Sequence, residues 1–317
     1  MGSFYGVNGK KLQRQYRDSL SEFKEWKEKP HAKEWLIFPE NMGTYLSIDE
    51  TTLSKGELYT IITNKKAKGR KGAIVAILAG TQVDPIVAQL LKIPKSLRDK
   101  VKEITLDMAN SMKAIAKKCF PKAIQVTDRF HVQKLALEAL QDIRIKHRWE
   151  AIDQENEQIK QAKTNQKNFN AETFSNGDTR KQLLARSRYL LYKAPNNWTE
   201  NQHLRSKILF DQYPDIKKAY DLVQGLRSIF NTATSIQSAY TKLAHWYKDV
   251  EQTGFKAFNT IANTITINYR SILNYFINRS TNASAESFNA KIKAFRAQFR
   301  GVKNVEFFLF RLTRIFA

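Results

Sequence analysis

Cysteine and long apolar runs are almost missing from this sequence of 317 residues, and each shortage excludes a class of protein. Cys119 is the only cysteine, so a disulfide framework and a cysteine-rich zinc site are excluded and a reducing compartment is expected. The longest apolar run, residues 73–79, is too short to cross a bilayer, and residues 1–20 carry no apolar signal core. We therefore expect a cytoplasmic protein with no membrane-spanning segment.

Acidic residues are scarce as well. The chain has 30 Asp and Glu against 53 Lys and Arg, which gives a formal net charge of +23. Solubility does not require such an excess, so a polyanionic partner is indicated, and nucleic acid is the leading one. Residues 51–128 hold fifteen basic and six acidic residues, and residues 269–317 hold nine and two. Because 42% of the residues are hydrophobic, this charge belongs to a folded protein rather than to a basic tail.

Runs of apolar and β-branched residues predict five strands, and helical spacing predicts the elements between them. The strands are expected at 44–48, 57–63, 73–78, 101–106 and 123–127, and the helices at 83–91, 112–119 and 129–151. The order βββαβαβα predicts an α/β fold. The Gly- and Lys-rich residues 64–72 predict a hairpin tip, which is either a solvated turn or a phosphate contact.

Changes in composition suggest the domain boundaries. Polarity rises through residues 160–180, and amphipathic helices follow up to residue 258. We expect an N-terminal arm at 1–43, a catalytic core at 44–150 and 269–317, and a helical insertion at 151–268. In the insertion, Trp198, Trp246 and Tyr247 could stack on an unpaired base, but burial in the core is the commoner role of such residues.

Three of the predicted strands end at an aspartate: Asp49, Asp107 and Asp128. Sites form at the carboxyl ends of strands in sheets that helices flank, and clustered carboxylates repel one another unless a cation lies between them. Hard oxygen ligands favour Mg²⁺ or Mn²⁺. Taken singly, each aspartate could instead cap a helix or begin a turn. Three together in so basic a chain favour a divalent-ion site.

The helix after residue 282 offers a fourth carboxylate, Glu286, in its first turns. Glu286, Asn289, Lys293 and Arg296 repeat at steps of three and four, so they share one face. An apolar stripe that includes Phe288 lies on the opposite face. The alternative for Glu286 is an ordinary first-turn acid that the helix dipole favours.

Together, these residues resemble a known family, the bacterial DDE transposases of the ISL-type insertion-sequence branch. The resemblance covers about residues 43–315. It rests on Asp49, Asp107, Glu286, the signature Asp128-x-x-His131, and the motif Asn282-Ala283-x-x-Glu286-x-x-Asn289-x-x-Ile292-Lys293. It implies an RNase H-like fold, with a mixed sheet and flanking helices interrupted by a large all-α insertion.

The resemblance also implies an activity: cleavage of DNA at the ends of a mobile element and transfer of the strands into target DNA. Asp49, Asp107 and Glu286 would be the catalytic residues and the ligands of two Mg²⁺ or Mn²⁺ ions. Asp128 and His131 would support them from outside the ligand set. The chain would then be nucleoid-associated and would act as a homo-oligomer. The alternatives are an RNase H-like nuclease or junction resolvase that does not join strands, and an inactive DNA-binding relative.

Basic and polar residues near this site are expected to contact the DNA backbone. They are Lys65, Lys66, Lys68, Arg70, Lys71, Asn289, Lys291, Lys293, Arg296 and Arg300. The roughly 44 residues before the first predicted strand contain neither a zinc-finger pattern nor a helix-turn-helix pattern. We therefore expect a separate DNA-binding partner protein, or the helical insertion, to read sequence.

Overall fold

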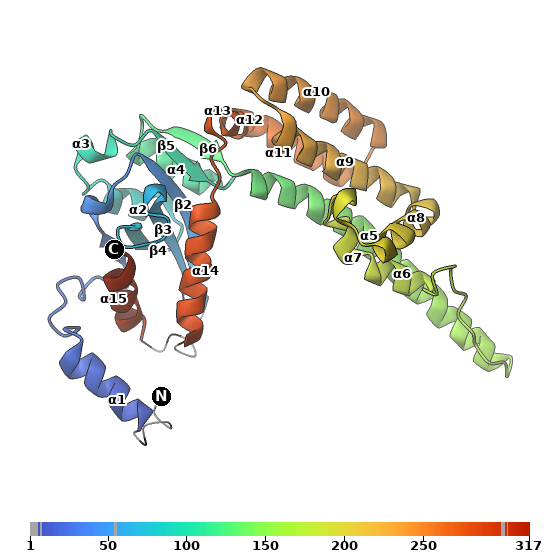
Figure 1. Ribbon diagram of the computed structural model, residues 1–317, viewed down its shortest axis with the longest axis horizontal. Helices are drawn as coiled ribbons and strands as arrows, with labels where there is room; N and C mark the ends of the chain where they lie inside the picture. The colour runs from blue at the N-terminus through green and yellow to red at the C-terminus, as the bar shows by residue number, and fades with distance from the viewer. Residues whose placement is uncertain (1–5, 7, 54–55, 299–301, 303) are drawn as a thin grey trace. The chain divides into compact units, whose positions relative to one another are not determined.

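The computed structural model describes residues 6, 8–53, 56–298, 302 and 304–317. The chain forms two compact units, which we call the sheet unit (Met1–Asp128 with Asn278–Ala317) and the helical unit (Arg129–Ile277) (Figure 1). The helical unit begins at Arg129, since helix α5 runs without a break from Arg129 to Thr164, and the predicted insertion at 151–268 lies within this unit.

The sheet unit is built on a six-stranded mixed sheet of order β1-β4-β3-β2-β5-β6. Its strands are β1 Trp35–Ile37, β2 Tyr45–Thr52, β3 Leu58–Asn64, β4 Ile74–Ala79, β5 Glu103–Leu106 and β6 Ile124–Thr127. Strands β1 to β4 pair antiparallel, whereas β5 pairs parallel with both β2 and β6. This α/β arrangement confirms the predicted RNase H-like fold. The sequence reading missed β1, a three-residue edge strand too short to show alternation.

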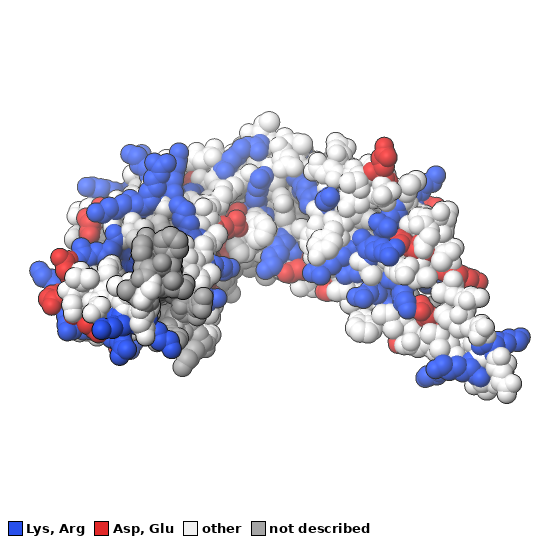
Figure 2. Space-filling model, turned by 60° about the horizontal axis from the view of Figure 1, so that its bottom comes forward, with Lys and Arg blue, Asp and Glu red and all other residues white. Residues whose placement is uncertain are grey.

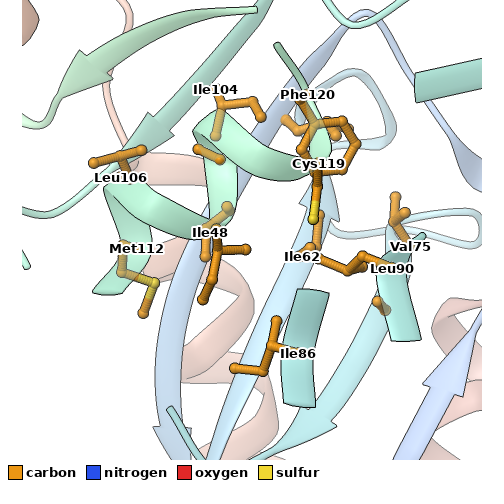
Figure 3. Close-up of a cluster of buried hydrophobic side chains, with 14 of the residues drawn as sticks. Ile48, Ile62, Val75, Ile86, Leu90, Ile104, Leu106, Met112, Cys119 and Phe120 are labelled. Atoms are coloured by element: carbon orange, nitrogen blue, oxygen red, sulfur yellow. The ribbon is translucent and has the colours of Figure 1, made fainter. Parts of the chain in front are cut away.

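Helices cover both faces of the sheet. On one face, α2 Val83–Leu90 and α4 Asn110–Cys119 pack on a fully buried apolar cluster, part of which Figure 3 shows. On the other face, α14 Ala283–Gln298 and α15 Val305–Phe316 pack on a second cluster. The predicted apolar stripe of α14 belongs to this second cluster through Phe288 and Ile292. The remaining helices of this unit are α1 Gly9–Gln15, α3 Lys95–Arg98 and the short turns Tyr16–Leu20, Pro39–Asn41 and Lys65–Ala67.

The helical unit contains α5 and shorter helices packed around it. They are α6 Arg180–Arg186, α7 Arg188–Leu191, α8 Glu200–Gln212, α9 Pro214–Thr232, α10 Ile236–Thr253, α11 Lys256–Ile267, α12 Tyr269–Leu273 and α13 Tyr275–Asn278, with a 3-10 turn at Pro195–Asn197. Trp246 is 2% exposed and its indole donates to the Leu222 carbonyl, so it is a core residue. No helix in the described part of the chain is long and apolar enough to cross a membrane.

Candidate active site

The three aspartates lie on the β2-β5-β6 side of the sheet. Asp107 and Asp128 directly follow β5 and β6, as the sequence suggested. The prediction for Asp49 was wrong in one respect, since β2 does not end there but continues to Thr52. The extra residues are held by pairing with β3, in which Thr51 lies opposite Tyr59. Asp49 therefore lies inside a strand, where the backbone fixes it more firmly than a loop would.

The strand register aligns Asp49 with Asp107. Ser47 of β2 pairs with Thr105 of β5 in a parallel ladder. Asp49 and Asp107 each lie two residues further along, so they share the face of that pair. Neighbouring strands are separated by about 4.8 Å, so the two backbone positions are adjacent.

The same ladder extends to Asp128. Thr105 pairs with Val126, and the Asp128 amide donates to the Leu106 carbonyl at 3.0 Å. Asp128 thus lies at the level of Asp107 on the next strand. The two environments differ, because Asp128 is only 1% exposed whereas Asp107 is partly exposed. A carboxylate so enclosed fits a supporting position better than one that faces a substrate.

Helix α14 lies alongside β2 on this face (Figure 1). The Asn289 side-chain amide donates to Asp49 Oδ2 at 2.7 Å. Two turns later, Arg296 donates to the Thr52 carbonyl at 3.2 Å and the Leu53 carbonyl at 3.3 Å. The helix and the strand therefore run in the same direction. Glu286 lies one turn before Asn289 on the same side of the helix and is exposed.

Glu50 is a further carboxylate next to Asp49 that was not predicted to belong to the site. Its pKa is raised, first by burial and then by the negative charges of Asp107 and Asp49. The Glu50 amide also donates to Asp49 Oδ1 at 2.8 Å. The acidic pair at 49 and 50 is visible in the sequence, but neighbouring residues of a strand point to opposite faces, so the sequence does not predict that both would interact with Asp107. Three carboxylates thus interact electrostatically here.

The donor chemistry fits a hard divalent cation, which would relieve the repulsion between these carboxylates. The described residues nevertheless contain no group of three or more His, Cys, Asp or Glu side chains arranged to hold a metal ion. Both oxygens of Asp49 already accept hydrogen bonds, from Asn289 and from the Glu50 amide. One oxygen of Asp107 accepts from the Ala109 amide at 2.8 Å. Asp49 and Asp107 therefore lie on neighbouring strands, and each already accepts hydrogen bonds from protein groups.

Lys65 differs from the other basic residues of the hairpin tip. Its side chain is 15% exposed, and its ammonium donates to Thr105 Oγ1 at 2.8 Å. Glu103 Oε1, on a side chain that is 3% exposed, lies 3.5 Å away. Burial lowers the pKa of Lys65, and the charges of Glu103 and Asp128 oppose that shift. Lys65 is thus a partly buried ion-pair partner of Glu103 and is less open to a DNA phosphate than its exposed neighbours on the hairpin tip.

The other predicted DNA contacts are distributed along the same unit. Lys66, Lys68, Arg70, Lys71 and Lys293 are exposed, whereas Lys291 donates to the Gly69 carbonyl at 2.8 Å. Arg300, together with Phe299 and Gly301 near the expected helix end, lies outside the described residues. Lys and Arg side chains cover more of the face in Figure 2 than Asp and Glu do. His131 is the third residue of α5, partly buried, with the Phe130 ring 5.8 Å from its own.

Comparison with known proteins adds independent evidence. The profile of a transposase family, the DDE family of the ISL3 type, matches residues 46–312. The transposase for insertion sequence element IS1001 of Bordetella parapertussis is 24% identical over 275 residues. That match covers 86% of this chain and 61% of the relative, so the chain spans about three fifths of its length. The profile includes all of the residues Asp49, Asp107, Asp128 and Glu286.

Proposed function

Because the chain belongs to the ISL3-type family of DDE transposases, we propose that it cuts DNA at the ends of an insertion sequence and joins the freed ends to target DNA. One observation carries the site assignment: the β2-β5 register brings Asp49 and Asp107 to adjacent positions on the face that α14 covers. Glu286, on α14, completes the set of three.

Asp49, Asp107 and Glu286 would hold the divalent ions. When bound, two Mg²⁺ or Mn²⁺ ions stabilise the attacking and leaving oxygens of a phosphodiester. Asn289 orients the Asp49 carboxylate through the 2.7 Å hydrogen bond. Asp128, enclosed beside Asp107, supports it from behind.

The exposed lysines and arginines of the sheet unit would place the DNA against this face. Lys66, Lys68, Arg70 and Lys71 come from the β3–β4 connection, and Lys293 comes from α14. Contacts of this kind set the position and the salt dependence of binding rather than its sequence preference. The homo-oligomeric active complex and the separate sequence-reading partner remain predictions.

The test is a cleavage assay on DNA that flanks the chain's own gene, with Mn²⁺ present. Asp49→Asn, Asp107→Asn and Glu286→Gln keep side-chain size and remove charge, so each should slow cleavage by about 100-fold or more. Asp84→Asn is the matched control, because Asp84 is highly exposed and pairs with Lys118 at the surface. A variant of the three that cleaves within about threefold of the unmodified chain would remove its residue from the ligand set.

A second assay, of strand joining, distinguishes a transposase from a nuclease. A labelled, pre-cleaved element end with a free 3′-OH should become joined to a target plasmid. Cleavage without joined products, at metal and DNA concentrations that saturate cleavage, would instead identify an RNase H-like nuclease. Cleavage that proceeds equally fast without a divalent metal ion would exclude both a transposase and an RNase H-like nuclease.

A further inference from the structure

The helical unit carries its own group of arginines. Arg144 of α5 is buried, and it donates to Gln141 Oε1 at 2.7 Å and to the Leu184 carbonyl at 2.9 Å. Gln141 in turn donates to the carbonyl of Arg188, at the start of α7. These bonds hold α7 against α5 and bring Arg188 to the part of α5 that carries Arg144 and Arg148.

No carboxylate in the described part of the chain forms an ion pair with Arg144, Arg148 or Arg188. The pKa of Arg144 is lowered, first by burial and then by the positive charges of Arg148 and Arg188. Within the described residues, neither Arg148 nor Arg188 forms an ion pair, and both are exposed. Arg186 and Arg205 show the contrast, because each of them pairs with the buried Asp178 in the same unit. Two exposed guanidinium groups therefore lie near a third that is buried.

An aromatic side chain stands beside them. Tyr189 is 68% exposed, and the Arg188 guanidinium lies 5.5 Å from the centre of its ring. Arg227 of α9 adds a further cation near this surface, donating to the Tyr192 carbonyl at 2.9 Å. Guanidinium groups beside an exposed aromatic ring are the combination that nucleic-acid-binding surfaces use.

We propose that Arg148, Arg188 and Tyr189 form a second DNA-binding surface, on the helical unit, in which the two arginines bind backbone phosphates. The planar guanidinium presents paired donors that match phosphate oxygens. Tyr189 restricts Arg188 and offers its exposed ring to a sugar or base. The proposal rests on the proposed function only because it takes DNA as the ligand. Its residues lie in α5 and α7 of the helical unit, whereas the proposed active site lies in the sheet unit. A protein partner is the competing occupant.

The test is equilibrium binding of a fluorescent DNA duplex to the full chain in EDTA, where cleavage plays no part. Each phosphate contact adds roughly 0.9 to the slope of log K against log salt, so Arg148→Ala/Arg188→Ala should lower the slope by about 1.8. At about 0.15 M salt that change corresponds to about 30-fold weaker binding. Tyr189→Phe should bind as the unmodified chain does, and Tyr189→Ala more weakly.

Lys248→Ala/Lys256→Ala is the control, because it removes the same charge from exposed positions on α10 and α11. It should weaken binding less than about threefold, because these lysines belong to other helices than the proposed surface and an exposed charge that makes no phosphate contact is screened by salt. If the two double variants bind equally, the inference fails while cleavage by the unmodified chain still supports the proposed function. If Arg148→Ala/Arg188→Ala changes the oligomeric state but not DNA affinity, the surface is a protein interface and the inference fails. If the unmodified chain binds but never cleaves, only the proposed function fails.

Discussion

Removing the Lys65 charge should destabilise the sheet unit, and the structure allows the size of the effect to be worked out. Lys65→Met keeps most of the side-chain stem but leaves Glu103, which is 3% exposed, without its only cationic neighbour within 4 Å among the described residues. Breaking a buried ion pair from one side costs about 3–5 kcal/mol. The lower end applies, because the Asn278 amide still donates to Glu103 Oε2 at 3.2 Å.

Cys119 provides the assay. It is the only cysteine, it is fully buried, and it packs in the apolar cluster that contains Ile104 and Leu106 of β5. A thiol reagent in native buffer therefore labels it only when this unit opens, which separates the sheet unit from the helical unit. A loss of about 3 kcal/mol should accelerate labelling by about 100-fold.

Two control variants test whether the faster labelling comes from the broken ion pair. Lys66→Met removes a charge from an exposed neighbour and should leave the labelling rate unchanged. Lys65→Met/Glu103→Gln removes both charges, and its glutamine oxygen can still accept from Asn278, so labelling should return to within about tenfold of the unmodified rate. If Lys65→Met labels within about threefold of the unmodified chain, the ion pair does not stabilise β5, and Lys65 is not needed to balance the charge of Glu103.

Two further predictions concern Asn289 and Cys119. Asn289→Ala leaves Asp49 Oδ2 without its 2.7 Å donor, so metal-dependent cleavage should fall by about tenfold while DNA affinity stays constant; a loss of affinity instead would assign Asn289 to DNA contact. Burial raises the pKa of Cys119 from 9.0 to about 11. The unfolded chain therefore loses this proton first, and as pH rises from 9 to about 11 the unfolding free energy should fall by about 2–3 kcal/mol. The measurement is the alkaline dependence of unfolding compared with Cys119→Ser, and equal dependences would refute the assignment.

The apolar patterns predicted strands β2 to β6, because each of them buries side chains that appear as a short apolar run in the sequence. Positions set by partners far along the chain were not visible in this way. β2 continues through the polar residues 50–52 because β3 pairs with them, and no property of that segment alone indicates it. Lys65 was predicted to contact DNA from the hairpin tip, because its partner Glu103 lies 38 residues away on another strand and could not be identified from the sequence.

In the candidate site, too, features set by the local sequence were predicted and features set by distant partners were not. The sequence identified the aspartates after β5 and β6 through their place at the ends of apolar runs. It placed Asn289 with the DNA contacts because α14 presents it beside basic residues, whereas the side chain donates to Asp49. A helix face shows which residues point the same way, but only the packing of that helix shows what they meet.

Helix α14 carries Glu286 in its first turn and contacts the rest of the sheet unit further along. The middle and the C-terminal half of the helix are tied down, by Lys291 to the Gly69 carbonyl and by Arg296 to β2. At its start, Asn282 is 1% exposed, yet neither polar atom of its side-chain amide has a hydrogen-bond partner among the described residues. A buried amide in that state costs free energy that a shift of the turn can recover. Glu286 belongs to that first turn, whereas Asp49 is fixed within a strand and Asp107 directly follows one. Among the three proposed ligands, Glu286 is therefore the one that is positioned by a helix rather than by a strand.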